Sequence, residues 1–283
     1  MTLFDRYVVV DWSASATPTT GANSIWIAVL DTTGEPRLHN PATRSQALDL
    51  VDDLLDSNGR SLVGVDAALG YPSGTAALFG LDGVPWLATW RRIAELVTDD
   101  AANRNNRFAA AATLNAATGA PEGPFWGAPS DAFEPVLQRT KPPSFPVAEF
   151  RAVELALRRR GLHPKSCWQL LGAGSVGGQT LTLLPGLVRL LERVAVWPLT
   201  TGLRPPTADV DVVAEIWPSM FVRSAAPGWV LDAAQVAGTA EACRRADRSG
   251  DLVRWLTPST PDAATVEREE GWILGVEGEI SSG

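Results

Sequence analysis

The first clear pattern in the chain is a short apolar run, 7–10, which ends abruptly in Asp11 and is followed by small hydroxyl residues. A run of aromatic and β-branched residues without alternation is typical of a strand buried on both faces. Burying a carboxylate without a partner is costly, so we expect Asp11 at the C-terminal end of this strand, beside a cation or a hydrogen-bond donor. Ligands bind at this end of the strands in open α/β sheets. The alternative is that Asp11 caps an ordinary turn.

A polar loop, 13–23, separates this run from a second apolar segment, 24–30. Two strands joined in this way predict an antiparallel hairpin, and residues 37–39 are a candidate third strand at its edge. Long loops inside compact domains are often functional, so the loop after Asp11 is a candidate ligand-contacting segment.

The next two elements bring a second acid to the same place. Apolar residues recur at helical spacing over 43–57, with Thr43 or Ser45 as the N-cap, which predicts an amphipathic helix. The apolar run 61–65 then ends in Asp66, as the first run ends in an acid. A helix that crosses over between neighbouring parallel strands brings their ends to one edge of the sheet. We therefore expect the two aspartates to lie close together.

Two further acids accompany later elements. The apolar runs 194–198 and 210–218 predict two more strands, and Glu215 lies near the end of the second. Asp232 falls in the first turn of an amphipathic helix predicted over 229–246. An acid at that position also compensates the helix dipole, which is the simpler explanation for it.

The long middle of the chain has a different character. From 74 to about 202, Ala-rich helical stretches alternate with Pro/Gly-rich joints, which predicts a helical insertion into a single domain covering 1–283. Within it, 172–178 matches the G-x-G-x-x-G string of dinucleotide-binding folds. A true fingerprint follows a strand and opens a helix, whereas Pro185 interrupts the segment that follows here. We interpret this glycine loop as a tight one, either ligand-contacting or merely compact.

Composition narrows the class of protein. The net charge of −8 argues against a protein that coats nucleic acid, which needs a dense positive surface. With only two cysteines and two histidines, a zinc centre is unsupported, and any metal would be held by oxygen, as Mg²⁺ or Mn²⁺ are. No secretory signal is recognisable, and the most apolar window, 181–199, is broken by Pro185 and charged residues. We expect a cytoplasmic protein with no membrane partner.

The four acids suggest a chemistry. Clustered carboxylates repel one another, so their joint ionisation makes sense where divalent cations neutralise them. Two such ions about 3.5–4 Å apart would activate a water and stabilise the leaving oxygen of a phosphate ester. The pattern predicts hydrolytic phosphoryl chemistry, with Asp11, Asp66 and Asp232 as metal ligands and catalytic residues, and Glu215 as a ligand or general base.

The order strand-Asp, hairpin, helix, strand-Asp and late helix-Asp resembles the ribonuclease H-like superfamily. More specifically, the turn from Asp66 to Pro72, the string from Glu215 to Pro218 and the helix that begins near Asp232 are similar to DUF429, a group of predicted nucleases. The resemblance implies an α/β fold with a mixed sheet of five or more strands flanked by helices, and a nuclease-like, metal-dependent phosphodiesterase. The chain departs from the group's pattern in the turns after the first two aspartates, which keeps the acids but alters the loops around them.

A phosphate-containing substrate, either nucleic acid or nucleotide, needs cations and hydroxyls for its phosphate and aromatic faces for its bases. The candidate substrate-binding residues are Ser13, Ser15, Arg104, Arg107, Arg151, Trp12 and Trp126.

A second hypothesis comes from a different class of protein. A hydroxyl-rich turn after a strand-end aspartate also suits an actin-like or sugar-kinase-like nucleotide binder, or a non-catalytic binding protein. The string 11–14 is also similar to proteins labelled as acting in molybdopterin guanine dinucleotide synthesis. An actin-like protein needs two such domains, however, and the chain shows one clear set of strands.

Overall fold

A six-stranded mixed sheet forms the centre of the computed structural model, which describes residues 2–120, 123–172, 174–207 and 209–278. In chain order the strands are β1 (Arg6–Asp11), β2 (Trp26–Asp31), β3 (Arg37–His39), β4 (Ser61–Val65), β5 (Val194–Trp197) and β6 (Asp211–Glu215). Their order across the sheet is β3-β2-β1-β4-β6-β5. β2 runs antiparallel to both of its neighbours, and the other adjacent pairs are parallel.

The strands β1, β2, β4 and β6 are buried on both faces, as unbroken apolar runs predict, whereas the edge strand β3 is not. Along β1, Val8 and Val10 belong to the core on one face and Tyr7 and Val9 to the core on the other, and each is at most 1% exposed. The β1/β2 hairpin, the edge position of β3 and the parallel pairing of β1 with β4 are also as expected. The prediction of an α/β protein with a mixed sheet of five or more strands is confirmed.

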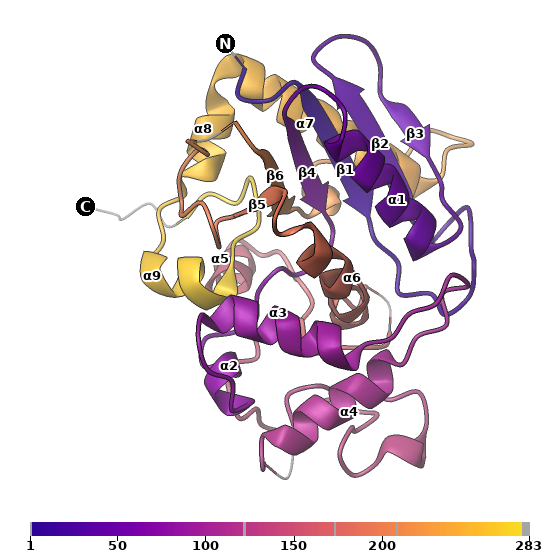
Figure 1. Ribbon diagram of the computed structural model, residues 1–283, viewed down its shortest axis with the longest axis vertical. Helices are drawn as coiled ribbons and strands as arrows, with labels where there is room; N and C mark the ends of the chain where they lie inside the picture. The colour runs from indigo at the N-terminus through magenta and orange to yellow at the C-terminus, as the bar shows by residue number, and fades with distance from the viewer. Residues whose placement is uncertain (1, 121–122, 173, 208, 279–283) are drawn as a thin grey trace.

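Helices cover both faces of this sheet (Figure 1). In chain order the helical segments are α1 (Arg44–Leu55), α2 (Thr75–Leu78), α3 (Pro85–Leu96), α4 (Arg107–Ala117), η1 (Asp131–Phe133), α5 (Ala152–Arg159), α6 (Gly177–Leu190), η2 (Pro218–Met220), α7 (Leu231–Ser249), α8 (Asp251–Leu256), α9 (Ala263–Thr265) and η3 (Val266–Glu270). α7 packs against β1 and β2 on one face, while α1 and α6 contribute to the core on the other. None of the helices in these ranges is long and apolar enough to span a lipid bilayer.

The middle segment, 74–202, is less purely helical than the sequence suggests. It contains α2 to α6, but also β5, which is the edge strand of the central sheet, so the helical part ends before Val194. α3 packs against α6, and Trp90 and Leu184 from these helices share one core with Val63 of β4. In Figure 1, α2, α3 and α4 lie together at the lower end of the molecule, below the strands.

The ends of the α-helices follow local signals in the sequence. α1 begins after Thr43, whose hydroxyl accepts a hydrogen bond from the Gln46 N–H, so Thr43 rather than Ser45 is the N-cap. α7 ends at Gly250 in the left-handed conformation, which glycine adopts without a side-chain clash.

Candidate functional site

Three aspartates occupy the C-terminal edge of the parallel strands and its surroundings. Asp11 is the last residue of β1, and Asp66 follows β4 directly, where its N–H donates to the Val10 carbonyl over 2.9 Å. Because β1 and β4 are adjacent and parallel, the two aspartates leave the sheet at the same edge. Asp232 lies in the first turn of α7, which packs against β1. We call Asp11, Asp66 and Asp232 the aspartate cluster.

Burial and nearby negative charges favour the neutral forms of the Asp11 and Asp66 carboxyls. Burial, with the negative charges of Glu215 and Asp232, raises the pKa of Asp66 to about 7. The pKa of Asp11 is raised well above its ordinary value, first by burial and then by the charges of Asp66 and Asp232. In the part of the chain that the structure describes, the carboxylates of Asp11 and Asp66 make no hydrogen bond or ion pair. Asp11 and Asp66 therefore lack a compensating cation, and ionisation of both would be favourable only where a ligand supplies one.

The long loop after β1 closes against α7. The Asn23 N–H donates a 2.6 Å hydrogen bond to Asp232 Oδ2, and the Ser13 hydroxyl donates to the Asn23 carbonyl over 3.4 Å. Asn23 has a φ of 58°, in the left-handed region that asparagine adopts more readily than most residues. Arg44 of α1 fixes the start of the loop by donating to the carbonyls of Ser13 and Ser15. The loop thus forms one wall of the aspartate cluster.

Glu215 does not act as the free carboxylate that the sequence led us to expect. It is 4% exposed, and its two oxygens accept hydrogen bonds from the Arg151 guanidinium at 2.6 and 2.7 Å. Its Oε2 also accepts the Leu69 N–H at 2.9 Å. A carboxylate satisfied in this way is neither a free general base nor an open metal ligand. Its role is to anchor the turn that follows Asp66.

Arg151 is equally unavailable to a phosphate group. It is 1% exposed, its Nε and Nη2 donate to Glu154, and its Nη1 donates to the Glu270 carbonyl. Together with the Glu215 pair, these bonds use all five guanidinium N–H groups. Although burial favours its neutral form, Glu154 and Glu215 raise the pKa of Arg151 well above its ordinary value. No guanidinium N–H of Arg151 is left for the substrate phosphate that we expected it to bind. We call Arg151, Glu154 and Glu215 the Arg151 network.

Two adjoining cavities open beside the aspartate cluster. The first cavity, of about 240 Å³, has Asp11 and Asp232 in its wall. The second cavity, of about 320 Å³, is lined by Asp66 and also by the three residues of the Arg151 network. Gly174 and Gln179 line both cavities, so they mark the boundary between them. The cluster thus faces open space on both sides of this boundary.

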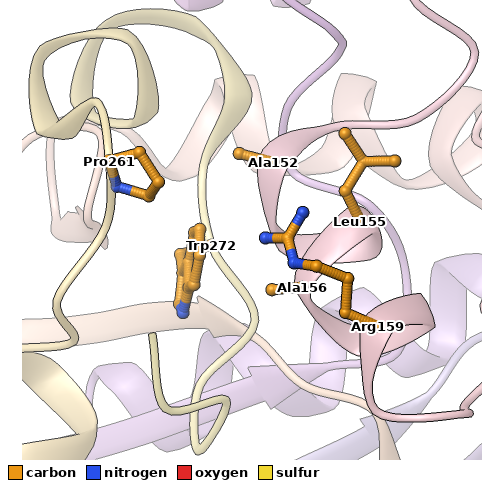
Figure 2. A pocket seen from close by; sticks show the side chains of 6 residues that line it. All are labelled: Ala152, Leu155, Ala156, Arg159, Pro261 and Trp272. Atoms are coloured by element: carbon orange, nitrogen blue, oxygen red, sulfur yellow. The ribbon is translucent and has the colours of Figure 1, made fainter. Parts of the chain in front are cut away.

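A third cavity lies between α5 and the C-terminal part of the chain (Figure 2). It measures about 170 Å³ and is lined mainly by apolar groups, from Ala152, Leu155, Ala156, Arg159, Pro261 and Trp272. No carboxylate lines it, and it shares no lining residue with the two cavities beside the aspartates. The candidate chemistry therefore belongs to the first and second cavities.

The glycine loop, 172–178, lies at the boundary of these two cavities. Gly172 and Gly174 have φ values of 116° and 69°, which residues with a side chain rarely adopt, and Ala173 lies outside the described residues. α6 starts at the end of this loop. We expected Pro185 to interrupt the segment, but the helix continues through it. No described strand leads into the loop, so the context of a dinucleotide fingerprint is missing.

The candidate residues in the loop after β1 have different roles. Ser13 lines the first cavity. The Ser15 hydroxyl is engaged with two neighbours inside the loop, and no described cavity reaches it. Trp12 borders the first cavity but is 2% exposed, and its indole N–H donates to Thr182 of α6 over 3.1 Å. Trp12 therefore fastens α6 to β1 and offers no free face for stacking.

The three candidates from the middle of the chain other than Arg151 line neither of the two cavities. Arg104 is exposed and pairs with Asp100. Arg107 is 8% exposed, its Nη1 donates to Asn105, and burial lowers its pKa to about 10. The backbone of Trp126 bridges two other chain segments, which indicates a structural role. These three residues therefore lie outside the candidate site.

Sequence reasoning did not single out four residues that line the cavities: His163, Lys165, Gln179 and Trp217. Gln179 lies in the first turn of α6 and donates to the Trp12 carbonyl. Lys165 carries one signal that the sequence does contain, because it is one of only two lysines among the 24 lysines and arginines. No motif marks His163 or Trp217, since they reach the cavity through the packing of distant segments.

The aspartate cluster has the type of ligand atom that a divalent cation prefers, but its carboxylates are not spaced to hold one. Oxygen donors with excess negative charge are the ligands that Mg²⁺ and Mn²⁺ prefer, so the cluster fits such an ion in kind. Within the described ranges, however, no group of three His, Cys, Asp or Glu side chains stands close enough together to hold one. A cation would have to draw the carboxylates together or take further ligands from water or substrate.

Comparison with known proteins adds no relative to this picture. No protein-family model, curated protein or solved structure matches the chain. The similarity to the ribonuclease H-like superfamily and to DUF429 therefore stays a prediction. The case for function depends on the geometry of the site.

Proposed function

We propose that the protein is a divalent-metal-dependent phosphodiesterase of the nuclease-like kind, with the aspartate cluster as its centre. One observation carries this proposal: carboxylates from β1, the end of β4 and α7 converge, and no cation among the described residues compensates Asp11 or Asp66. Buried charges of one sign are unfavourable unless a ligand supplies the other sign. The strand order β3-β2-β1-β4, with β2 reversed, supports the finer proposal of a ribonuclease H-like fold.

In this proposal Asp11, Asp66 and Asp232 hold the cation. A bound divalent cation lowers the pKa of a water and stabilises charge on phosphate oxygens. The chain itself positions the ligands: the Asn23 N–H orients Asp232, and the Leu69 contact of Glu215 holds the turn after Asp66. Because the pKa of Asp66 is about 7, this carboxyl gives up its proton near neutral pH when a cation approaches.

Metal-dependent hydrolysis of a generic phosphodiester, bis(p-nitrophenyl) phosphate, tests the proposal. We expect turnover with Mn²⁺ or Mg²⁺ and a loss of at least about 100-fold in Asp11→Asn and in Asp232→Asn, because each removes a charged ligand. Asp49→Asn is the matched control, since Asp49 is exposed on α1. Equal activity in Asp11→Asn and wild type, or no metal-dependent activity in wild type, would contradict the proposal.

A second function, nucleotide binding without hydrolysis, is favoured by the absence of a ready-made three-ligand group among the described side chains. Thermal unfolding in the presence of ATP, GTP or single-stranded DNA separates the two functions. Stabilisation by ATP or GTP in EDTA, combined with no phosphodiester turnover, would support the binding protein. Stabilisation that requires Mn²⁺ would support the phosphodiesterase.

A further inference from the structure

The second cavity contains cationic and aromatic groups that the proposed catalysis does not use. Lys165 and Trp217 line it together with Asp66. In the part of the chain that the structure describes, Lys165 makes no hydrogen bond or ion pair, with Asp66 or with any other residue. The two residues therefore line the same cavity without pairing, and Lys165 is exposed to solvent. A cavity lined by an unpaired lysine offers a cation to an anionic ligand.

The backbone that carries Lys165 is firmly anchored. Pro164 and Ser166, on either side of it, are buried, and the Ser166 hydroxyl donates to the Glu149 carbonyl over 3.0 Å. The aliphatic stem of Lys165 lies beside Gly174, where an added Cβ would be 3.8 Å from both its Cγ and its Cε. Lys165 thus lies against the glycine loop that separates the two cavities and lines the second of them.

Part of the lining of the second cavity is apolar and aromatic. Trp217 is partly buried and lies just beyond the end of β6, and Ile216 and Ile273 lie beside it in the cavity wall. An indole face next to aliphatic side chains suits a flat, largely apolar group such as a nucleobase. The volume of about 320 Å³ falls within the range of about 300–1,000 Å³ that is usual for small-molecule sites.

The same features favour a small ligand over a polymer. The arginines that could have followed a nucleic-acid backbone are engaged elsewhere, Arg104 with Asp100 and Arg151 in its buried network. The net charge of −8 also opposes binding to a long polyanion. We propose that the second cavity binds a nucleoside monophosphate, with Lys165 contacting the phosphate and Trp217 packing against the base. The choice of a phosphate ligand rests on the proposed function.

Lysine-specific NMR tests this site directly, because the chain has only two lysines. Reductive ¹³C-methylation, which keeps the positive charge, gives separate signals for Lys141 and Lys165 in the full-length protein. Adenosine 5′-monophosphate, added in EDTA, is expected to shift the Lys165 signal and leave that of Lys141 unchanged. Lys141 is a suitable internal control because it is paired with Glu149. Adenosine, which lacks the phosphate, is expected to leave both signals in place at the same concentration.

Binding measured by calorimetry provides the second arm of the test. Loss of a charge-assisted contact in Lys165→Gln is expected to weaken binding of adenosine 5′-monophosphate at least about tenfold, whereas Lys141→Gln leaves it unchanged. Trp217→Leu is expected to weaken binding of adenosine 5′-monophosphate but not of ribose 5-phosphate. An unmoved Lys165 signal, or equal affinity in Lys165→Gln and wild type, would overturn the proposed site.

The outcomes keep this inference apart from the proposed function. Binding at Lys165 without any phosphodiester turnover would contradict the proposed phosphodiesterase and support the nucleotide site. Metal-dependent turnover with an unchanged Lys165 signal would support the phosphodiesterase and contradict the nucleotide site. Because the binding experiments contain EDTA and need no turnover, they remain informative in Asp11→Asn as well.

Discussion

Asp66 of the aspartate cluster and the Arg151 network line the same cavity, yet the carboxylates of the two groups differ in whether a cation compensates them. Glu215 ends β6 much as Asp11 ends β1, but its carboxylate is paired with a buried arginine and accepts a backbone N–H. Asp11 and Asp66 have no such partner in the described ranges, and the pKa values of both are raised. An acid at a strand end is thus not in itself a functional group; its partner decides whether it supports the fold or faces a ligand.

Removing Arg151, the cation of the Arg151 network, is expected to give the largest change in stability. In Arg151→Met, Glu154 and Glu215 would be left buried without a counter-charge, and we expect a loss of about 3–5 kcal/mol in the free energy of unfolding, measured by urea denaturation. Arg104→Met, which breaks an exposed pair, is the matched control and should leave stability nearly unchanged. Equal effects of the two substitutions would remove the contrast between paired and unpaired acids.

Binding of a divalent cation at the aspartate cluster is expected to give the next largest change in stability. A ligand that binds only the folded state at 100 times its Kd stabilises it by about 2.7 kcal/mol. We therefore expect Mn²⁺ to raise the melting temperature of the wild-type protein and not that of Asp11→Asn. A Mn²⁺ effect of the same size in both proteins would place the ion elsewhere.

Removing one charge from the unpaired region should stabilise the protein at neutral pH. Because the pKa of Asp66 is raised to about 7 in the folded state, folding binds extra protons between its ordinary value and pH 7, so stability falls as the pH rises through that window. Asp66→Asn abolishes this loss; since the carboxyl keeps some contact with solvent, we expect a gain of about 1–2 kcal/mol at pH 8 without metal. Little difference from wild type is expected near pH 4. Chemical denaturation at the two pH values checks this, and a gain that did not depend on pH would count against it.

The smallest effect is expected in the loop that orients Asp232. Asn23 has a positive φ, so Asn23→Ala should cost about 1 kcal/mol through backbone strain, while Asn23→Gly should cost less. Both variants keep the N–H that donates to Asp232, so metal-dependent activity should change little. Thermal unfolding and phosphodiester hydrolysis check the two halves of this prediction. A similar loss of stability in both variants would show that the side chain, not the backbone conformation, is what matters at this position.

The sheet was predictable from the sequence because its signals are local. Unbroken apolar runs mark strands buried on both faces, and helical spacing of apolar residues together with the Thr43 cap marks α1. The same logic placed Asp11 and Asp66 at one edge, since adjacent parallel strands share that edge. Pro185 shows the limit of such signals, because α6 runs through a residue that normally ends a helix.

The partners of the charged residues were not predictable in the same way. Glu215 and Arg151 are 64 positions apart, and nothing local in either segment announces their pairing. Arg151 and Arg104 look alike in sequence, yet one is fully buried in an ion network and the other is exposed. Lys165 and Trp217 likewise reach the second cavity only through the packing of distant segments. Sequence patterns identify candidate acids and cations, whereas tertiary packing decides which of them stay available.

Anomalous diffraction from crystals soaked in Mn²⁺ tests most directly whether the aspartate cluster binds a divalent cation. We predict a strong Mn²⁺ peak at ligand distance from carboxylate oxygens of Asp11 and Asp66, with Asp232 close by, and no such peak in crystals of Asp11→Asn. A peak located only elsewhere in the molecule, or none at all beside these aspartates, would contradict the proposed metal centre.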